Sequence, residues 1–178
     1  TYEFKIKNYS TVYAAYDVKL SDDLAAAFTG VTSVSVQSVT PVSVSGITPL
    51  VVNAGYNGVS DQNILVPTGN VIHQSEEKLV RVVVRVVGGA GTYYNQAVVS
   101  GSQAAGMPVV TTDLSNNGAN PDPNGDFNPS TNVNEDIPTP VVISGASLGV
   151  AKSAGVVVAV SATEYDIPYT ITVKNLSK

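Results

Sequence analysis

The sequence predicts an all-β protein, an antiparallel β-sandwich of Ig-like type, with a closed barrel as the alternative. Val, Thr, Ser and Tyr are abundant while Leu, Glu and Lys are scarce, a composition that favours strands. Several segments alternate between apolar and polar residues, and Gly, Pro and Asn interrupt them at short intervals. With 178 residues, 43% of them hydrophobic, the chain can bury a core as one large domain or two small ones.

The first strand is expected at residues 2–8, where Tyr2, Phe4 and Ile6 share one face. The only helical-looking stretch, residues 22–28, is short enough for one turn, and Asp22 and Asp23 are placed to cap it. Further strands are expected at residues 12–20, 31–44, 47–52 and 64–66, the second of them either one long strand broken near Pro41 or two short ones.

The clearest alternation in the chain is KLVRVVVRVV, residues 78–87. Its even-numbered valines share one face, and Arg81, Val83 and Arg85 share the other. Residues 88–91, Gly-Gly-Ala-Gly, predict a hairpin turn, because glycine accepts backbone angles that tight turns need. Residues 92–101 then return as one strand, with Tyr93 and Tyr94 on opposite faces, one in the core and one on the surface; short strands follow at 109–112 and 141–143.

The two ends of the chain carry the same strand. TYEFKIKNYS matches PYTITVKNLSK at a constant offset of 167 residues, with residues 156–160 expected to run out and 169–173 to run back as a hairpin. We therefore expect residues 1–147 to form a repeat that lacks its first strand, and residues 148–178 to form the first hairpin of the following repeat. That hairpin could pair with a second molecule by strand exchange or fold back in cis; otherwise the boundary is arbitrary and the polypeptide continues.

A polar segment rich in Asn, Asp and Pro spans residues 113–140 and predicts a long loop that needs another source of order. Side-chain oxygens recur at every second residue of DPNGDFN, a spacing that can wrap a Ca²⁺ ion, which prefers six to eight oxygen ligands. Asn134 and Glu135 could complete the shell, and the alternative is a solvated linker of turns. The candidate metal ligands are Asp113, Asp122, Asn124, Asp126, Asn128 and Asp136.

Several function classes are disfavoured by composition. The net charge is −5 and no cluster of Lys and Arg exists, so nucleic acid is not an expected partner. There is no Cys, and no apolar run reaches the length of a membrane span. His73 is the sole histidine, and no nucleophile motif accompanies it, so we expect no enzyme activity.

Four segments resemble the bacterial conserved-repeat surface domain, long filed as domain of unknown function number eleven. They are VKLSDDLAAAF (18–28), GYNGVSDQNIL (55–65), GTYYNQAVVSG (91–101) and the polar segment 113–141. Their order and spacing match along essentially the whole chain, and the polar segment is the most specific. One departure is the Asn-rich stretch 115–120, where other members often carry Asp, which weakens a charge-dependent metal site there.

The resemblance implies a non-catalytic, Ig-like tandem repeat of very large secreted adhesins, stalks or filaments on a bacterial surface. Its expected partners are neighbouring repeats or identical subunits, end to end. Two other functions stay open: a self-assembling filament subunit linked by donor-strand exchange of residues 148–178, and a module that binds glycans or surfaces through an exposed Tyr.

Overall fold

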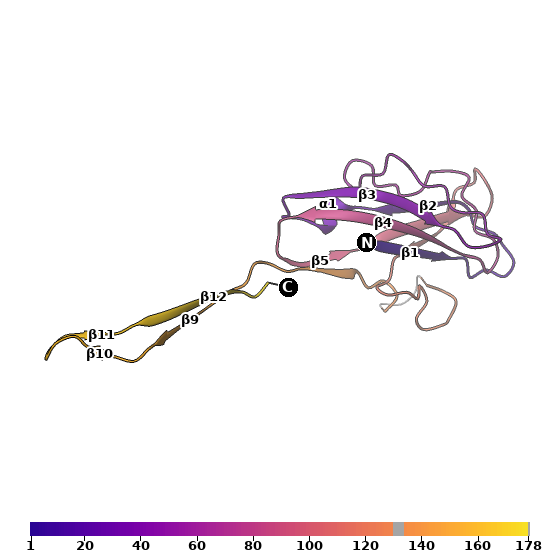
Figure 1. Ribbon diagram of the computed structural model, residues 1–178. Helices are drawn as coiled ribbons and strands as arrows, with labels where there is room; N and C mark the ends of the chain where they lie inside the picture. Colours follow the sequence, from indigo (N-terminus) through magenta and orange to yellow (C-terminus); the bar gives the residue numbers. More distant parts are fainter. Residues whose placement is uncertain (130–133, 178) are drawn as a thin grey trace. The chain divides into compact units, whose positions relative to one another are not determined.

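The computed structural model describes residues 1–129 and 134–177 and divides into two compact units, Thr1–Val142 and Ile143–Lys178. It is all-β with antiparallel strands, which confirms the all-β, antiparallel part of the prediction (Figure 1). The strands that precede the terminal hairpin are β1 (Tyr2–Lys7), β2 (Tyr16–Asp22), β3 (Ser33–Val42), β4 (Glu77–Val87), β5 (Gly91–Asn95), β6 (Ala97–Ser102), β7 (Val109–Leu114) and β8 (Thr139–Ile143).

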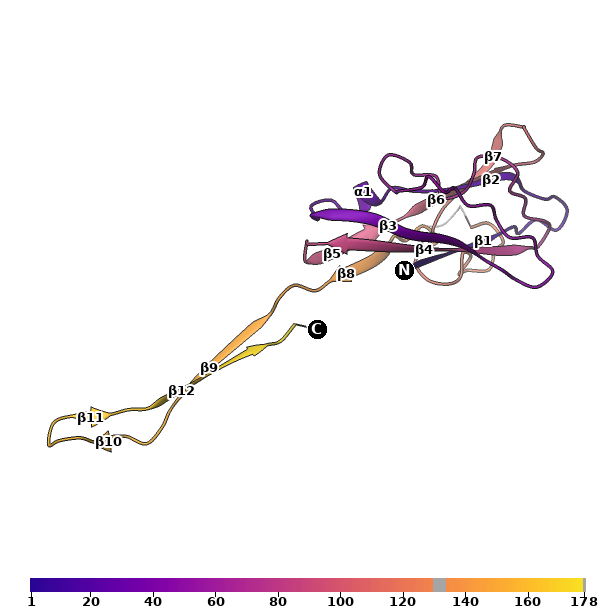
Figure 2. The ribbon, with the colours of Figure 1, turned by 45° about the horizontal axis from the view of Figure 1, so that its top comes forward.

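Two three-stranded sheets, with strand orders β1-β4-β3 and β2-β6-β7, make up most of unit 1, and β5 pairs with β8 (Figure 2). Alternate residues of both sheets supply the core: Phe4, Ile6, Val80 and Val82 from the first, and Val18, Leu20 and Ala97 from the second. Each sheet thus hides one apolar face, an arrangement consistent with a β-sandwich.

The strands β1 and β4 form where the sequence alternates most clearly. They pair antiparallel with Tyr2 opposite Val82 and Phe4 opposite Val80, so the apolar residues of both strands lie on one face. Val80 and Val82 have no exposed surface, while Arg81, on the other face, is exposed and pairs with Glu3 at 2.7 Å. The period of two in the sequence therefore sets the register of this ladder.

The segment 31–44 forms a single strand, and its irregularity is not at the predicted place. The register of β3 on β4 shifts between Val36 and Ser38, which inserts Gln37 as a bulge, whereas Pro41 stays paired with Val80. Since β3 is an edge strand of its sheet, Pro41 can sit there without removing a needed hydrogen bond.

Two predictions around the glycine-rich turn are wrong. Residues 88–91 do not close a hairpin, because β4 pairs with β1 and β3 while the following β5 pairs with β8. Gly88 and Gly89, with φ of 76° and 71°, instead turn the chain from one sheet to another. The strand expected at 92–101 breaks at Gln96, so that β5 and β6 pair with different neighbours.

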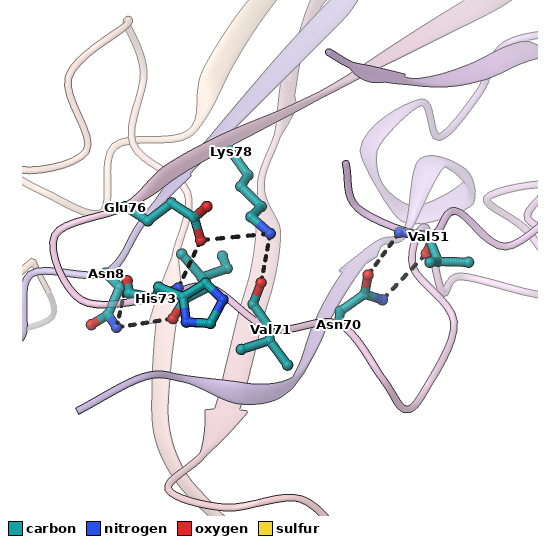
Figure 3. Close-up of polar contacts among 8 residues, drawn as sticks. Asn8, Val51, Asn70, Val71, His73, Glu76 and Lys78 are labelled. Atoms are coloured by element: carbon teal, nitrogen blue, oxygen red, sulfur yellow. Dashed lines mark hydrogen bonds and ion pairs between the residues drawn. The ribbon is translucent and has the colours of Figure 1, made fainter. Parts of the chain in front are cut away.

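The strands expected at 47–52 and 64–66 are reduced to an isolated bridge between Val52 and Leu65. The Asn70 side chain supplies hydrogen bonds that a neighbouring strand would otherwise make. It accepts one from the Val51 N–H at 2.7 Å and donates one to the Val51 carbonyl at 3.2 Å (Figure 3). The strand expected at 12–20 begins only at Tyr16. The helical turn is present as α1 (Leu24–Ala27), and Asp23 caps it by accepting from Ala26 N–H at 2.9 Å.

Unit 2 is a two-stranded ribbon made of β9 (Leu148–Ala154) with β12 (Tyr169–Asn175) and, toward its tip, β10 (Val158–Ala159) with β11 (Tyr165–Asp166) (Figure 1). The predicted partner of the returning strand is wrong. Residues 169–173 pair with 150–154 and not with 156–160, because the connection between the strands holds its own small hairpin.

Candidate functional site

The terminal ribbon presents apolar side chains that it cannot bury by itself. Val150 on β9 is 75% exposed, and Ile171 on β12 is 63% exposed. Two paired strands form one layer, so both faces lack a covering layer within this unit. Isolated two-stranded hairpins are marginally stable in water, and a row of exposed apolar residues on one of them is a feature of an interaction surface.

The repeat detected in the sequence extends to local structure. Asn8 Oδ1 accepts a hydrogen bond from the Ser10 N–H at 3.0 Å, and Asn175 Oδ1 accepts one from the Ser177 N–H at 2.9 Å. The same turn thus follows β1 and β12. Their partners differ, however, since β1 pairs with β4 and β12 pairs with β9.

In unit 1, Asn8 does more than form this turn. Its Nδ2 donates to the carbonyls of Ile72 and His73, both at 3.1 Å, and so ties the end of β1 to the segment before β4 (Figure 3). His73 itself is exposed, and its backbone N–H donates to Glu76 Oε2 at 2.7 Å. The histidine thus lies in a structural turn that is held by its backbone.

A groove runs along β1, between the two sheets. It consists of two adjoining cavities of about 350 and 210 Å³. Residues from β1 line one side and residues from β6 and β7 line the other, and both cavities share Lys5, Ile6, Val99, Asp113 and Pro121. We call this the β1 groove.

The carboxyl group of Asp113 lies in the β1 groove, and its hydrogen-bonding capacity is only partly satisfied there. Its Oδ1 is buried and has no hydrogen-bond partner in the part of the chain that the structure describes. Burial, together with the neighbouring Asp136 and Glu135, raises the pKa of Asp113 to about 7. A buried polar atom without a partner is uncommon in folded proteins, and a cation supplied from outside would resolve it.

The polar loop brings together only part of the predicted metal set. Asp122, Asp126 and Glu135 each place a carboxylate oxygen within 4.8 Å of the others. Asp113 lies on β7 and Asp136 lies beside Gln96, whose Nε2 donates to the Asp136 carbonyl at 2.8 Å. Glu135, predicted only as a possible addition to the shell, belongs to this cluster and is 1% exposed.

Hydrogen bonds within the loop account for much of its order. Asp122 accepts from the N–H groups of Gly125 at 2.9 Å and Phe127 at 3.1 Å. Asn124 Oδ1 accepts from Asp126 N–H, and Asp126 Oδ1 accepts from Asn128 N–H, both at 2.8 Å. The side-chain oxygens at the predicted alternate positions therefore form successive Asx turns.

The two adjacent tyrosines lie as the sequence predicts. Tyr93 packs against Phe28 with ring centroids 5.4 Å apart, and its hydroxyl donates to the Gly89 carbonyl at 2.7 Å. Tyr94 is 63% exposed. One side chain is thus anchored to the core and the other is open to solvent.

Lys152 was not among the residues predicted from the sequence. It lies on β9 with its Nζ 3.8 Å from the centroid of the Tyr169 ring. A signal was present, since Lys152 is the only charged residue between positions 143 and 163, in an otherwise apolar and small-residue stretch. A single charged residue in such a strand is expected to interact with a specific side chain.

Comparison of this chain with family models, with curated proteins and with solved structures finds no match. The resemblance to the conserved-repeat surface domain therefore stays a prediction from sequence. Among the described residues, no helix has the length and apolar character needed to cross a bilayer.

Proposed function

We propose that this chain is a non-catalytic structural module of an extracellular filament or adhesin on a bacterial surface, joined to identical copies by its terminal ribbon. The resemblance to tandem surface repeats supports the setting, with an Ig-like fold. The observation that carries the linkage is unit 2, a ribbon with an uncovered apolar face whose strand β12 repeats the apolar pattern of β1.

The physical reason for self-association is the difference between the two environments of the repeated strand. In unit 1, Phe4 and Ile6 are at most 9% exposed, whereas the matching Ile171 and Val173 are 63% and 68% exposed. Val150 of β9 lies opposite Val173 on the same face and is 75% exposed. Burial of apolar surface stabilises by about 25 cal/mol per Å², so a second copy that covers apolar side chains of this face lowers the free energy of the system. Paired strands would then carry load along their hydrogen-bond ladders.

Sedimentation and negative-stain electron microscopy of the purified full chain test this function. We expect concentration-dependent, end-to-end oligomers, and we expect the substitution Val150→Asp in the ribbon to abolish them. The matched control is Val12→Asp, which places the same charge at a 65% exposed valine in a loop of unit 1 and is expected to leave the oligomers intact.

A wild-type chain that stays monomeric at all accessible concentrations would refute the linkage. Binding of soluble oligosaccharides by that monomer would support the glycan-binding alternative instead. Loss of oligomers in both Asp variants would show that the effect belongs to added charge and not to the ribbon.

A further inference from the structure

One edge of β1 is used for pairing and the other is not. The Asn8 N–H donates to the Glu76 carbonyl at 2.9 Å, at the end of the β1–β4 ladder. In an antiparallel pair the backbone groups of alternate residues point to opposite edges, so Tyr2, Phe4 and Ile6 direct theirs toward β4. The backbone groups of the odd-numbered residues 3, 5 and 7 point the other way, and no described strand pairs with that outer edge.

On β12 the opposite edge is the one in use. The Leu176 N–H donates to the Ser147 carbonyl and the Gly155 N–H donates to the Pro168 carbonyl, both at 2.7 Å. The even-numbered residues of β12 therefore point their backbone groups at β9. At the offset of 167, Thr170, Thr172 and Lys174 match residues 3, 5 and 7 of β1. The edge of β12 that pairs with β9 therefore corresponds to the outer edge of β1, with which no described strand pairs.

We propose that β9 of a second copy of this chain releases β12 and pairs antiparallel with the outer edge of β1, in the register that it has on β12. Ala154 then lies opposite Tyr2, Lys152 opposite Phe4, and Val150 opposite Ile6. This inference rests on the proposed function and specifies its acceptor, its register and its polar contact. Addition of a strand to an exposed sheet edge is a common mode of recognition.

The position of Lys152 shows which face of β9 enters the β1 groove. Its Nζ lies over the ring of Tyr169, so Lys152 is on the face of β12 that carries Tyr169, Ile171 and Val173. These residues match Tyr2, Phe4 and Ile6, which face the core of unit 1. A second copy docked in this register therefore directs Lys152 inward, between the two sheets.

Asp113, an acidic residue in the β1 groove, is complementary in charge to Lys152. Asp113 lines both cavities beside Lys5 and Ile6, the residues next to Phe4, and its Oδ1 is buried without a partner. Lys152 is the sole charged residue of β9, and an ion pair with Asp113 would satisfy both groups away from water. This complementarity selects β9 of a second copy as the occupant.

The apolar neighbour of Lys152 fits the same register. Val150, 75% exposed in the ribbon, would lie opposite Ile6, which lines both cavities together with Val99. The outward face of β9 carries only Gly149, Ala151 and Ser153, which suits a strand that leaves that face near solvent. One face of β9 therefore carries side chains that can fill the β1 groove, and the other face carries only small ones.

A charge exchange tests the contact in the full chain. We expect Lys152→Asp and Asp113→Lys each to weaken self-association at least tenfold in sedimentation experiments. The double variant, and an equimolar mixture of the two single variants, should regain association within about threefold of wild type, because each restores opposite charges. Lys174→Asp, on the neighbouring strand of the ribbon, is the matched control and should have little effect.

A disulfide cross-link tests the register. Because the chain has no Cys, only the introduced cysteines can form it. Ala151 lies opposite Thr172 in the ribbon, so the proposal places it opposite Lys5 of the second copy. Paired residues of this kind have Cα atoms about 5.5 Å apart, within disulfide range. We expect a mixture of Lys5→Cys and Ala151→Cys chains to form a disulfide-linked dimer, and Lys5→Cys with Ser153→Cys to form far less.

The outcomes separate this inference from the proposed function. If Val150→Asp abolishes oligomers while both charge variants associate normally, or if the Ser153 pair cross-links as well as the Ala151 pair, the acceptor and register are refuted and the ribbon linkage stands. If Val150→Asp changes nothing, the linkage fails, and the strand exchange fails with it.

Discussion

Asn95 donates a hydrogen bond from its Nδ2 to Oδ2 of Asp22 at 2.9 Å, and both side chains are buried, at 3% and 2% exposure. The other carboxylate oxygen of Asp22, Oδ1, has no hydrogen-bond partner among the described residues. Burial raises the pKa of Asp22 to about 6, against an opposing contribution from the Asn95 hydrogen bond and a further rise from Asp23. The folded state therefore favours the protonated acid.

This shift makes Asp22 a source of pH-dependent stability. Because the folded pKa is above the unfolded value of 3.8, the folded state holds the proton more tightly between these values, and stability falls as pH rises from about 4 to about 6. At about 1.4 kcal/mol per pKa unit, the loss at pH 7 is on the order of 3 kcal/mol. We expect Asp22→Asn to be more stable than wild type at pH 7, with the difference vanishing near pH 4, in urea unfolding.

The comparison with wild type at each pH isolates this group from the other acids. A matched control is Asp166→Asn in the ribbon, where the carboxylate is exposed and no such difference is expected. Equal pH profiles for wild type and Asp22→Asn would contradict the prediction.

The Asp122, Asp126 and Glu135 cluster allows a direct test of the predicted calcium ion. If the loop binds Ca²⁺, an ion concentration of a hundred times Kd stabilises the folded state by about 2.7 kcal/mol. We expect the melting temperature to rise by several degrees when EDTA is replaced with CaCl₂. The variant Asp126→Asn should not show this rise. Identical melting with and without Ca²⁺ would leave the loop ordered by its Asx turns alone.

Lys78 contributes to stability through a buried contact. Its Nζ donates to the Val71 carbonyl at 2.7 Å and lies 3.5 Å from Glu76 Oε2, with both side chains largely buried (Figure 3). Lys78→Met keeps the apolar stem but leaves a carbonyl and a carboxylate without this donor, so we expect a loss of about 1–3 kcal/mol in chemical unfolding. Lys7→Met, at an exposed position of β1 where Nζ lies 4.8 Å from the centroid of the Tyr9 ring, should change stability by less than about 1 kcal/mol.

Alanine substitutions at Gly58 and Gly30 distinguish the effect of a steric clash from the effect of backbone strain. Both have positive φ, but a Cβ at Gly58 would lie 2.4 Å from Cδ1 of the buried Leu24, whereas a Cβ at Gly30 meets nothing within 4 Å. We expect Gly58→Ala to be less stable than Gly30→Ala by about 1–3 kcal/mol, the usual cost of overpacking a core. Equal losses for the two variants would show that only the backbone angle matters.

Alternation predicted β1 and β4 because both strands have one buried and one open face, and the hydrophobic effect then fixes their register. It also predicted the capped turn of α1, since Asp23 acts on a neighbour three residues away. Local signals of this kind need no knowledge of the rest of the fold.

Local signals failed where distant residues decide the outcome. Residues 92–101 were predicted as one strand, yet the chain changes sheets at Gln96 because the two halves of the segment meet different partners. For the candidate site, the sequence pointed to the polar loop and to the terminal ribbon but not to Asp113 as part of the β1 groove. Its burial depends on β1, β6 and β7, which meet only in the folded chain.

The amino-acid order by itself determined the all-β class, the faces of the regular strands and the repetition of β1 as β12, because these depend on residue type and spacing along one segment. The tertiary structure decided which strands are neighbours, which edge of β1 has no described strand beside it, and where one carboxylate oxygen of Asp113 is removed from water. Hydrogen-bond partners and burial are properties of segments far apart in the chain, and only packing brings them together.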